Sequence, residues 1–221
     1  QDFTDWELII VDDGSTDNTH EILLPYLKDE RIKYFKNEKN SGICVTRNKA
    51  LENSIGEYVA VLDSDDVWLA EDKLSQQVDF LDFNYEYALI GTGVGVIDEA
   101  GQEIKRYLNP EGALAIRNSL LAKNSFAHSS VMYRREVVAS MGSYPLNLNG
   151  IEDYDLWLRL GQKYKLHNLP LYDLGYRKHS GNISLTDRIR LMEANLTLIK
   201  KYQQYYPNFY WAWLRRSSRL F

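Results

Sequence analysis

The sequence predicts an α/β fold whose Rossmann-like sheet is mixed, mainly parallel, and flanked by helices. Two short apolar runs, at 7–11 and 57–62, have the composition of strands that are buried on both faces, as in a parallel sheet. Each run ends in a burst of aspartate, at 12–13 and at 63–66. Because open α/β sheets bind their ligands at the carboxyl ends of the strands, both bursts are expected at a ligand site.

Strands and helices alternate through the first half of the chain. The first helix has Ser15 and Asp17 as competing N-caps, and Pro25 should kink it or end it near Leu24. Gly56 ends the second helix. The expected elements are strand 7–11, helix 16–28, strand 31–35, helix 43–54, strand 57–62, helix 71–83 and strand 87–97, which turns at 98–101 into a hairpin.

The strict alternation ends after Pro110. The expected elements of the second half are helix 111–123, strand 129–133, a helix with an acidic first turn at 150–160, extended segments through 166–176 and helix 187–206. The last helix carries one apolar stripe, and Pro207 ends it.

Length and composition limit the function classes. A chain of 221 residues suits one domain, alone or with a C-terminal appendage. The formal net charge of −5 argues against nucleic acid as the main partner. The single cysteine, Cys44, rules out an intramolecular disulfide and fits a reducing compartment. Because no apolar stretch reaches the roughly 18 residues of a membrane span and no signal peptide opens the chain, we expect a cytoplasmic protein. The sequence carries no indication of oligomeric state.

The aspartates at 12–13 and 63–66 raise an electrostatic problem, because closely packed carboxylates repel one another unless a cation lies between them. Hard divalent ions such as Mg²⁺ or Mn²⁺, which also bridge substrate phosphates, are the usual solution. The two bursts therefore predict a metal–nucleotide site.

Five segments, in this order, resemble the GT-A fold glycosyltransferases of family 2. They are Ile9–Asp17 at the first strand end, Asn40–Gly42 with Thr46–Asn48, Asp63–Asp66 as a DxD metal motif, Glu152–Leu160 as an acidic catalytic block, and Tyr176–His179 as a late basic motif. The resemblance implies a GT-A glycosyltransferase domain over 1–186, with a nucleotide-sugar-binding half at 1–97 and an acceptor-binding half at 98–186. A C-terminal helical tail at 187–221 would follow it.

The resemblance further implies a metal-dependent, inverting transfer of a sugar. The donor would be a nucleotide-diphospho-sugar, most commonly a UDP-sugar, and the acceptor a hydroxyl of a glycan or lipid-linked molecule in bacterial cell-surface polysaccharide synthesis. Asp153 would be the general base, with Glu152 as the second choice. The implied nucleotide-sugar-binding residues are Asp12, Asp13, Gly14, Ser15, Gly42, Arg47, Asp63, Ser64 and Arg177. The implied ligands of Mn²⁺ or Mg²⁺ are Asp63, Asp65 and His179.

The acidic clusters could instead have structural roles. The pair at 12–13 could cap helix 16–28, and the pair at 152–153 could complement the dipole of its helix. At the level of function, the strand end at 62–65 also fits a phosphatase of the haloacid dehalogenase type. A catalytically inactive nucleotide-sugar-binding or scaffold module is the other alternative.

Two further expectations concern the ends of the chain. The chain enters its first strand at once, so by comparison with the family it would lack the first strand of the sheet and leave two strand edges unpaired. At the other end, residues 205–221 combine aromatic with basic side chains: Tyr210, Trp211, Trp213, Arg215, Arg216, Arg219 and Phe221. This composition is typical of an interfacial segment, so the tail could contact the inner face of a membrane peripherally; docking on the domain is the alternative.

Overall fold

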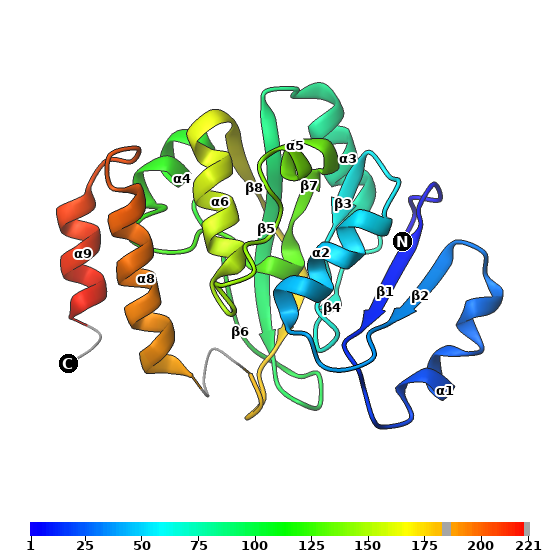
Figure 1. Cartoon of the computed structure of the whole chain (residues 1–221). Helices are drawn as coiled ribbons and strands as arrows, with labels where there is room; N and C mark the ends of the chain where they lie inside the picture. Colours follow the sequence, from blue (N-terminus) through cyan, green and yellow to red (C-terminus); the bar gives the residue numbers. More distant parts are fainter. Residues whose placement is uncertain (183–186, 219–221) are drawn as a thin grey trace.

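The structure, a computed structural model, describes residues 1–182 and 187–218. It has an α/β fold with a central six-stranded sheet covered by helices and a two-stranded sheet beside it (Figure 1). The predicted fold class, a mixed sheet flanked by helices, is therefore confirmed. Figure 1 shows the small sheet at one end of the molecule and the helices α8 (Arg188–Tyr202) and α9 (Phe209–Ser217) at the other.

The first half of the chain follows the predicted alternation. Its elements are β1 (Leu8–Asp12), α1 (Thr19–Leu23), the 3-10 turn η1 (Tyr26–Lys28), β2 (Ile32–Lys36), α2 (Ile43–Asn53), β3 (Tyr58–Ala60), β4 (Val67–Trp68), α3 (Lys73–Phe83) and β5 (Tyr87–Ile97). The predicted helix 16–28 forms two short pieces, because Pro25 has no N–H for the helix and separates them. Strand β5 has the predicted bounds.

The second half differs more from the prediction. Its elements before the C-terminal helices are β6 (Glu103–Tyr107), α4 (Ala113–Ser119), the 3-10 turn η2 (His128–Ser130), β7 (Met132–Arg134), α5 (Arg135–Ser140), α6 (Glu152–Lys163) and β8 (Lys165–Arg177). The strand predicted at 129–133 thus begins as the η2 turn and becomes strand only at Met132, and the extended segments predicted at 166–176 form one long strand.

The sheets contain less parallel pairing than predicted. The six-stranded sheet has the order β3-β7-β5-β8-β4, and β6 pairs with β5 outside this path. Among the described strands, β5–β8 and β1–β2 are parallel, whereas β3–β7, β5–β7, β5–β6 and β4–β8 are antiparallel. A short hairpin turn joins β5 to β6, so β6 runs back along β5. Strand β7 begins opposite Ile90 and runs back toward the start of β5.

The direction of β7 decides which segments gather at one edge of the sheet. Ala60 at the end of β3 pairs with Met132 at the start of β7, and the Val61 N–H donates to the Val131 carbonyl at 3.1 Å. The η2 turn before β7 therefore lies beside the aspartates that follow β3. Because β8 pairs in parallel with β5, its carboxyl end reaches the same edge.

Helix α6 anchors this edge to the core. Leu156, Trp157, Leu158 and Leu160 are fully buried, and the same hydrophobic cluster contains buried residues of both C-terminal helices: Leu191, Leu198, Ile199, Tyr202 and Ala212. Helices α8 and α9 thus pack on the core that holds α6. The predicted division at residue 186 stays a prediction, because residues 183–186 lie outside the described part of the chain.

Strands β1 and β3 each have an edge without a strand partner among the described residues. A side chain connects the two sheets here: Glu7 Oε1 accepts hydrogen bonds from the N–H groups of Ile55 (2.5 Å) and Gly56 (3.1 Å), just before β3. The expectation of an absent first strand stays a prediction.

Candidate active site

Asp12 closes the turn that follows β1. Its buried carboxylate accepts hydrogen bonds from the Ser15 N–H (2.7 Å, Oδ1) and from the Tyr34 hydroxyl (2.6 Å, Oδ2). Burial raises the pKa of Asp12, but the hydrogen bonds from Tyr34 and Ser15 outweigh burial and hold this pKa well below its usual value. Asp12 therefore stays charged and shapes the turn 12–15, in which Ser15 is half-buried.

Asp13 connects this turn to the start of α2. Its Oδ1 accepts hydrogen bonds from the Asn37 side-chain amide and the Ser41 N–H, and its Oδ2 accepts one from the Gly42 N–H, each at 2.8 Å. Gly42 is the N-cap of α2, so Asp13 satisfies a free donor at that helix end. At the start of α1 the carboxylate of Asp17, one of the two candidate N-caps, accepts a hydrogen bond from the Thr19 N–H at 3.0 Å, so the structure does not support the alternative in which the pair at 12–13 caps this helix.

Gly14 lies where this turn meets the loop before α2. Its φ is +80°, and an added Cβ would lie 2.7 Å from the Lys39 carbonyl carbon and 2.8 Å from the Asn40 nitrogen. We expect Gly14→Ala to lower the free energy of unfolding by about 1–3 kcal/mol, because the backbone conformation strains alanine and the facing backbone must shift. Urea unfolding would compare it with Gly101→Ala, where φ is +84° but nothing lies within 4 Å of the added Cβ. Equal losses would show that the loop contact is unimportant.

Arg47 of α2 joins two acidic residues that are far apart in the sequence. Its Nη2 donates to Asp63 Oδ1 at 2.7 Å, and its Nη1 pairs with the Glu152 carboxylate at the start of α6. Glu152 is buried and also accepts a hydrogen bond from the Gly150 N–H at 2.5 Å. Burial, with a contribution from the neighbouring Asp153 carboxylate, raises the pKa of Glu152. Through Arg47, Glu152 thus connects α6 to α2 and to the loop after β3.

Asp153 is the next residue of α6 and is half-buried. Its Oδ2 accepts a hydrogen bond from the Asn124 side-chain amide (3.0 Å), and its Oδ1 accepts one from the Tyr154 N–H (2.6 Å). Among the described residues, no lysine or arginine forms an ion pair with it. The carboxylate of Asp153 is therefore oriented but not neutralised.

Asp155, the third acidic residue of this turn, ties α6 to the C-terminal helix α8. It is buried and pairs with Arg159 at 2.7 Å on its own helix. Its Oδ1 also accepts hydrogen bonds from Lys201 Nζ (3.0 Å) and the Tyr202 hydroxyl (2.8 Å) of α8. Burial raises the pKa of Asp155, but these partners outweigh burial and lower it overall. Asp155 has a structural role.

Asp65 and His179 are the predicted metal ligands that the structure brings together. His179 Nε2 lies 2.9 Å from Asp65 Oδ2, and both side chains are partly exposed. A carboxylate oxygen and an imidazole nitrogen at an accessible point fit a divalent ion that keeps water and phosphate oxygens as its other ligands. Within the described ranges, no group of three His, Cys, Asp or Glu side chains is placed to hold a metal, and Asp63 pairs with Arg47.

Arg177 at the end of β8 holds the loop after β3. Its N–H donates to Asp66 Oδ1 and its Nε to the Asp65 carbonyl, both at 2.9 Å. Its Nη1 donates to the carbonyls of Asp98 (3.1 Å) and Glu99 (3.0 Å) in the β5–β6 turn. Arg177 thus lies beside the predicted metal ligands, as expected, but its donors bind the protein itself.

The predicted site residues form two sets. The first shapes the turn after β1 and the start of α2: Asp12, Asp13, Gly14, Ser15 and Gly42. The second gathers at the carboxyl ends of β3 and β8 with α2 and α6: Arg47, Asp63, Asp65, Glu152, Asp153, Arg177 and His179. Ser64 is exposed in the loop after β3.

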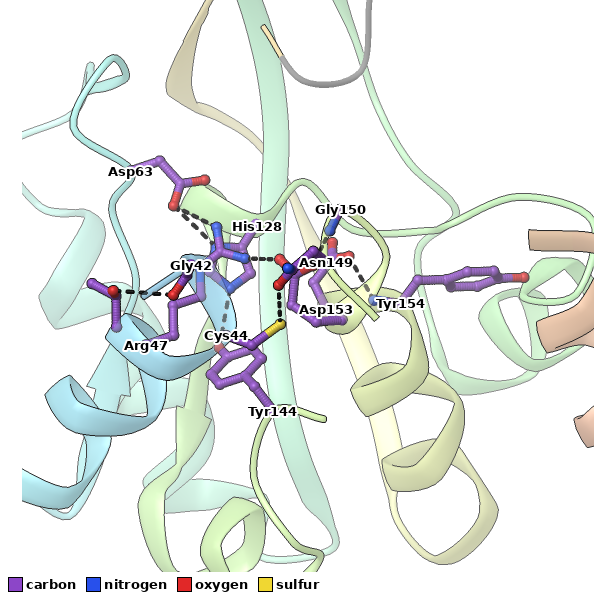
Figure 2. Close-up of polar contacts among 12 residues, drawn as sticks. Gly42, Cys44, Arg47, Asp63, His128, Tyr144, Asn149, Gly150, Asp153 and Tyr154 are labelled. Carbon is purple, nitrogen blue, oxygen red and sulfur yellow. Dashed lines mark hydrogen bonds and ion pairs between the residues drawn. The ribbon is translucent and has the colours of Figure 1, made fainter. Parts of the chain in front are cut away.

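Three residues of this site could not be found from the sequence: Asn124, His128 and Tyr144. Asn124 orients Asp153, and His128 lies between Asp63 and Tyr144 (Figure 2). None of them belongs to a recognisable motif. The one available signal was a histidine directly before a candidate strand, and this signal has meaning only once the strand is known to run antiparallel to β3.

The fold and this site define a protein of the GT-A glycosyltransferase fold. The crystal structure of S. aureus TarS 1-349 superposes with a TM-score of 0.71 at 22% identity, over 99% of this chain and 65% of that chain. A sequence profile of glycosyl transferase family 2 matches residues 1–142. The chain belongs to this family, which sets aside the haloacid dehalogenase alternative.

Curated relatives support this assignment. The putative teichuronic acid biosynthesis glycosyltransferase TuaG of Bacillus subtilis is 40% identical over 160 residues, which are 72% of this chain and 61% of TuaG. The Escherichia coli UDP-Glc:alpha-D-GlcNAc-diphosphoundecaprenol beta-1,3-glucosyltransferase WfaP is 33% identical over 227 residues, 96% of this chain and 83% of WfaP. The chain thus spans about three fifths of TuaG. Of its described helices, none has the length and apolar character needed to cross a membrane.

Proposed function

We propose that this chain transfers a sugar from a nucleotide-diphospho-sugar, with UDP as the expected nucleotide, to a hydroxyl of a glycan or lipid-linked acceptor. The observation that carries the proposal is that the three acidic residues of α6 have different partners. Glu152 binds Arg47 and Asp155 binds α8, whereas Asp153 is oriented by two neutral donors. Of these three carboxylates, Asp153 is therefore the one left to accept a proton.

Asp153 would act as the general base in a single displacement. It takes the proton of the acceptor hydroxyl while the acceptor oxygen forms a bond to the anomeric carbon of the donor. The bond from that carbon to the diphosphate oxygen breaks, and the nucleoside diphosphate leaves with its electron pair. Attack from the face opposite the leaving group inverts the anomeric configuration. The hydrogen bonds from Asn124 and Tyr154 hold the carboxylate in one orientation for this step.

The donor would bind between the turn after β1 and the loop after β3. About a third of the Asp63 side chain is exposed (34%), so this carboxylate can accept hydrogen bonds from ribose hydroxyls or a base N–H. Arg47 supplies a fixed positive charge beside it. A divalent ion held by Asp65 and His179 would neutralise charge on the diphosphate.

The names of relatives and structural neighbours support these substrate classes. The name of WfaP gives UDP-Glc as its donor and a diphosphoundecaprenol-linked sugar as its acceptor. TarS has been crystallised with UDP and with UDP-GlcNAc. A Pyrobaculum calidifontis mannosyltransferase, with a TM-score of 0.66 at 17% identity, was solved with GDP-Man and Mn²⁺. UDP- and GDP-sugars with Mn²⁺ are therefore the donors to test first.

A thermal-shift screen of UDP-, GDP- and dTDP-sugars with Mn²⁺ tests the donor. A ligand at about 100 times its Kd should add ~2.7 kcal/mol to the free energy of unfolding. Nucleoside diphosphate release is then measured with soluble glycans and lipid-linked sugars as acceptors. A donor that binds but is never consumed would favour the inactive binding module, and the absence of any stabilising nucleotide-sugar would contradict the proposal.

We also propose that α9 contacts a membrane surface peripherally. Tyr210, Trp211 and Leu214 are 83%, 54% and 62% exposed, while Ala212 on the same helix is buried in the core. Residues 187–221 contain seven Lys or Arg and two Asp or Glu, a net charge of +5, so the rest of the chain carries −10. Exposed aromatic residues on a basic segment suit the headgroup region of an anionic membrane. The predicted contacts Arg219 and Phe221 lie outside the described residues.

Flotation with vesicles tests this surface. We expect the protein to float with vesicles that contain anionic lipid and the double variant Trp211→Ala/Leu214→Ala to float several-fold less, because it loses the apolar contact. Leu146→Ala is the matched control, since Leu146 is 65% exposed but lies in the loop before α6. A protein that stays wholly in the soluble fraction, or a control that behaves like the double variant, would contradict the proposal.

A further inference from the structure

We propose that His128 is a positioning residue of the donor site: its Nδ1–H holds the Asp63 carboxylate in the orientation that presents Oδ2 to the donor. This inference rests on the proposed function, because Asp63 matters only if a donor binds there. The contact itself is a property of the free protein, and its first test needs no substrate.

The side chain of His128 lies between Asp63 and the ring of Tyr144 (Figure 2), and the ring of Trp157 packs against it as well. It begins the η2 turn and is 8% exposed, with Nδ1 3.4 Å from Asp63 Oδ1 and Nε2 3.0 Å from the Tyr144 hydroxyl oxygen. The ring stacks on Trp157, with centroids 6.2 Å apart and planes at 30°. Stacking and the two polar contacts together restrict rotation of the imidazole, so Nδ1 keeps facing Asp63.

Tyr144 selects the ring nitrogen that carries the hydrogen. Burial raises the pKa of Tyr144 far above its ordinary value, so its hydroxyl keeps a proton to donate. The Tyr133 hydroxyl lies 3.4 Å away and can in turn donate to Tyr144. The two contacts allow a series of donors that runs from Tyr133 through Tyr144 to Nε2 of His128, and we infer this direction because it places an N–H, and not a lone pair, opposite the Asp63 carboxylate. This series leaves Nδ1 as the N–H group that faces Asp63.

The segment that begins with His128 holds Asp63 by its backbone as well. The Asp63 N–H donates to Ser129 Oγ at 3.1 Å, and the Ser129 carbonyl accepts a hydrogen bond from the Trp68 indole at 2.9 Å. At the side chain, Arg47 and His128 both approach Oδ1, whereas Oδ2 accepts no hydrogen bond from any described residue. Arg47 donates a hydrogen bond to Oδ1, and Nδ1 of His128, a buried nitrogen without another hydrogen-bond partner among the described residues, lies 3.4 Å from the same oxygen. An N–H on this nitrogen would help to fix the carboxylate plane and leave the other oxygen for a ligand. Burial raises the pKa of Asp63, but His128 and Arg47 outweigh burial and lower it overall.

The tautomer of His128 is the first test. Long-range ¹H–¹⁵N NMR of the full chain at pH 8, where an unperturbed imidazole is neutral, resolves the four histidines, with His128→Asn as the assignment variant. We expect the Nδ1–H tautomer for His128, although free histidine favours Nε2–H. Tyr144→Phe keeps the ring and removes the hydroxyl, so it should shift the His128 signals toward a mixture. An Nε2–H tautomer in the wild-type protein would overturn the inference.

Donor binding is the second test. We expect His128→Ala to raise the Kd for UDP about 10–100-fold and to raise KM for the donor more than it lowers kcat, because Asp63 acts in binding. His128→Asn keeps an N–H donor near the position of Nδ1 and should recover most of the affinity. In a cycle with Asp63→Asn, the two losses should be far from additive. Equal losses for the Ala and Asn variants with additive effects would show a general packing role and overturn the inference. If no nucleotide-sugar binds the wild-type chain, the proposed function fails, and the NMR result alone decides the contact.

Discussion

Asp153→Asn should lower turnover by about 10²–10⁴-fold while the Kd for the donor changes by no more than a few-fold. Asparagine keeps the size of the side chain and can still accept the hydrogen bond from Asn124, but it cannot take up the acceptor proton. The loss should therefore fall on kcat. Steady-state kinetics and calorimetric donor binding on the same preparation separate the two quantities.

Asp155→Asn is the matched control, because the same substitution is made two residues further along the same helix. It weakens the ion pairs to Arg159 and Lys201, so we expect a lower melting temperature but unchanged turnover per folded molecule. If Asp153→Asn has near wild-type turnover, another residue must be the base, and Glu152 would be the next residue to test. A loss of donor affinity instead would place Asp153 in the donor site.

Removal of the divalent ion should have the next largest effect. We expect chelation with EDTA to weaken UDP binding at least tenfold, because the diphosphate charge then faces the carboxylates of the loop after β3 without compensation. Asp65→Ala should weaken binding in Mn²⁺ to a similar level and should make binding insensitive to EDTA, since ion and side chain act as one unit. Calorimetric titration of UDP with and without Mn²⁺ measures both.

The control for Asp65→Ala is Asp79→Ala, which removes an exposed carboxylate from α3 away from this edge. It should leave both the affinity and its dependence on Mn²⁺ unchanged. UDP affinity that responds neither to EDTA nor to Asp65→Ala would show that Asp65 and His179 do not hold an ion in the donor complex. The hydrogen bond between His179 and Asp65 would then have a structural role only, at the end of β8.

The parts of the fold that depend on local patterns could be predicted from the sequence. The strand at 87–97 and the helix that starts at Ile43 are predicted correctly, because local composition and glycine positions determine them. The direction of the strands is not predicted correctly, since a strand of three residues such as β7 has no periodicity that distinguishes parallel from antiparallel pairing. That direction depends on contacts between β3, β5 and β7 that are far apart in the sequence.

The same distinction applies to the site. Residues in motifs could be located because aspartate clusters directly after buried strands are typical of ligand sites in α/β folds, and Arg47, Asp63 and the start of α6 do meet. His128 could not be found, because its importance follows from the reversed strand that brings η2 to Asp63. Nor could the sequence show that Asp12 and Asp13 use their oxygens to shape the loops rather than to face solvent.

The bond between Asp155 and the last long helix has a consequence for how the chain can be divided. A fragment cut before α8 would leave Asp155 as a buried carboxylate with Arg159 as its remaining partner and would strip the outer support from the turn that carries Asp153. The unit that must stay intact around the proposed catalytic residues therefore extends into α8. By the same connection, we expect a load on the C-terminal helices, for example at a lipid surface, to act on α6, the helix that carries the proposed base.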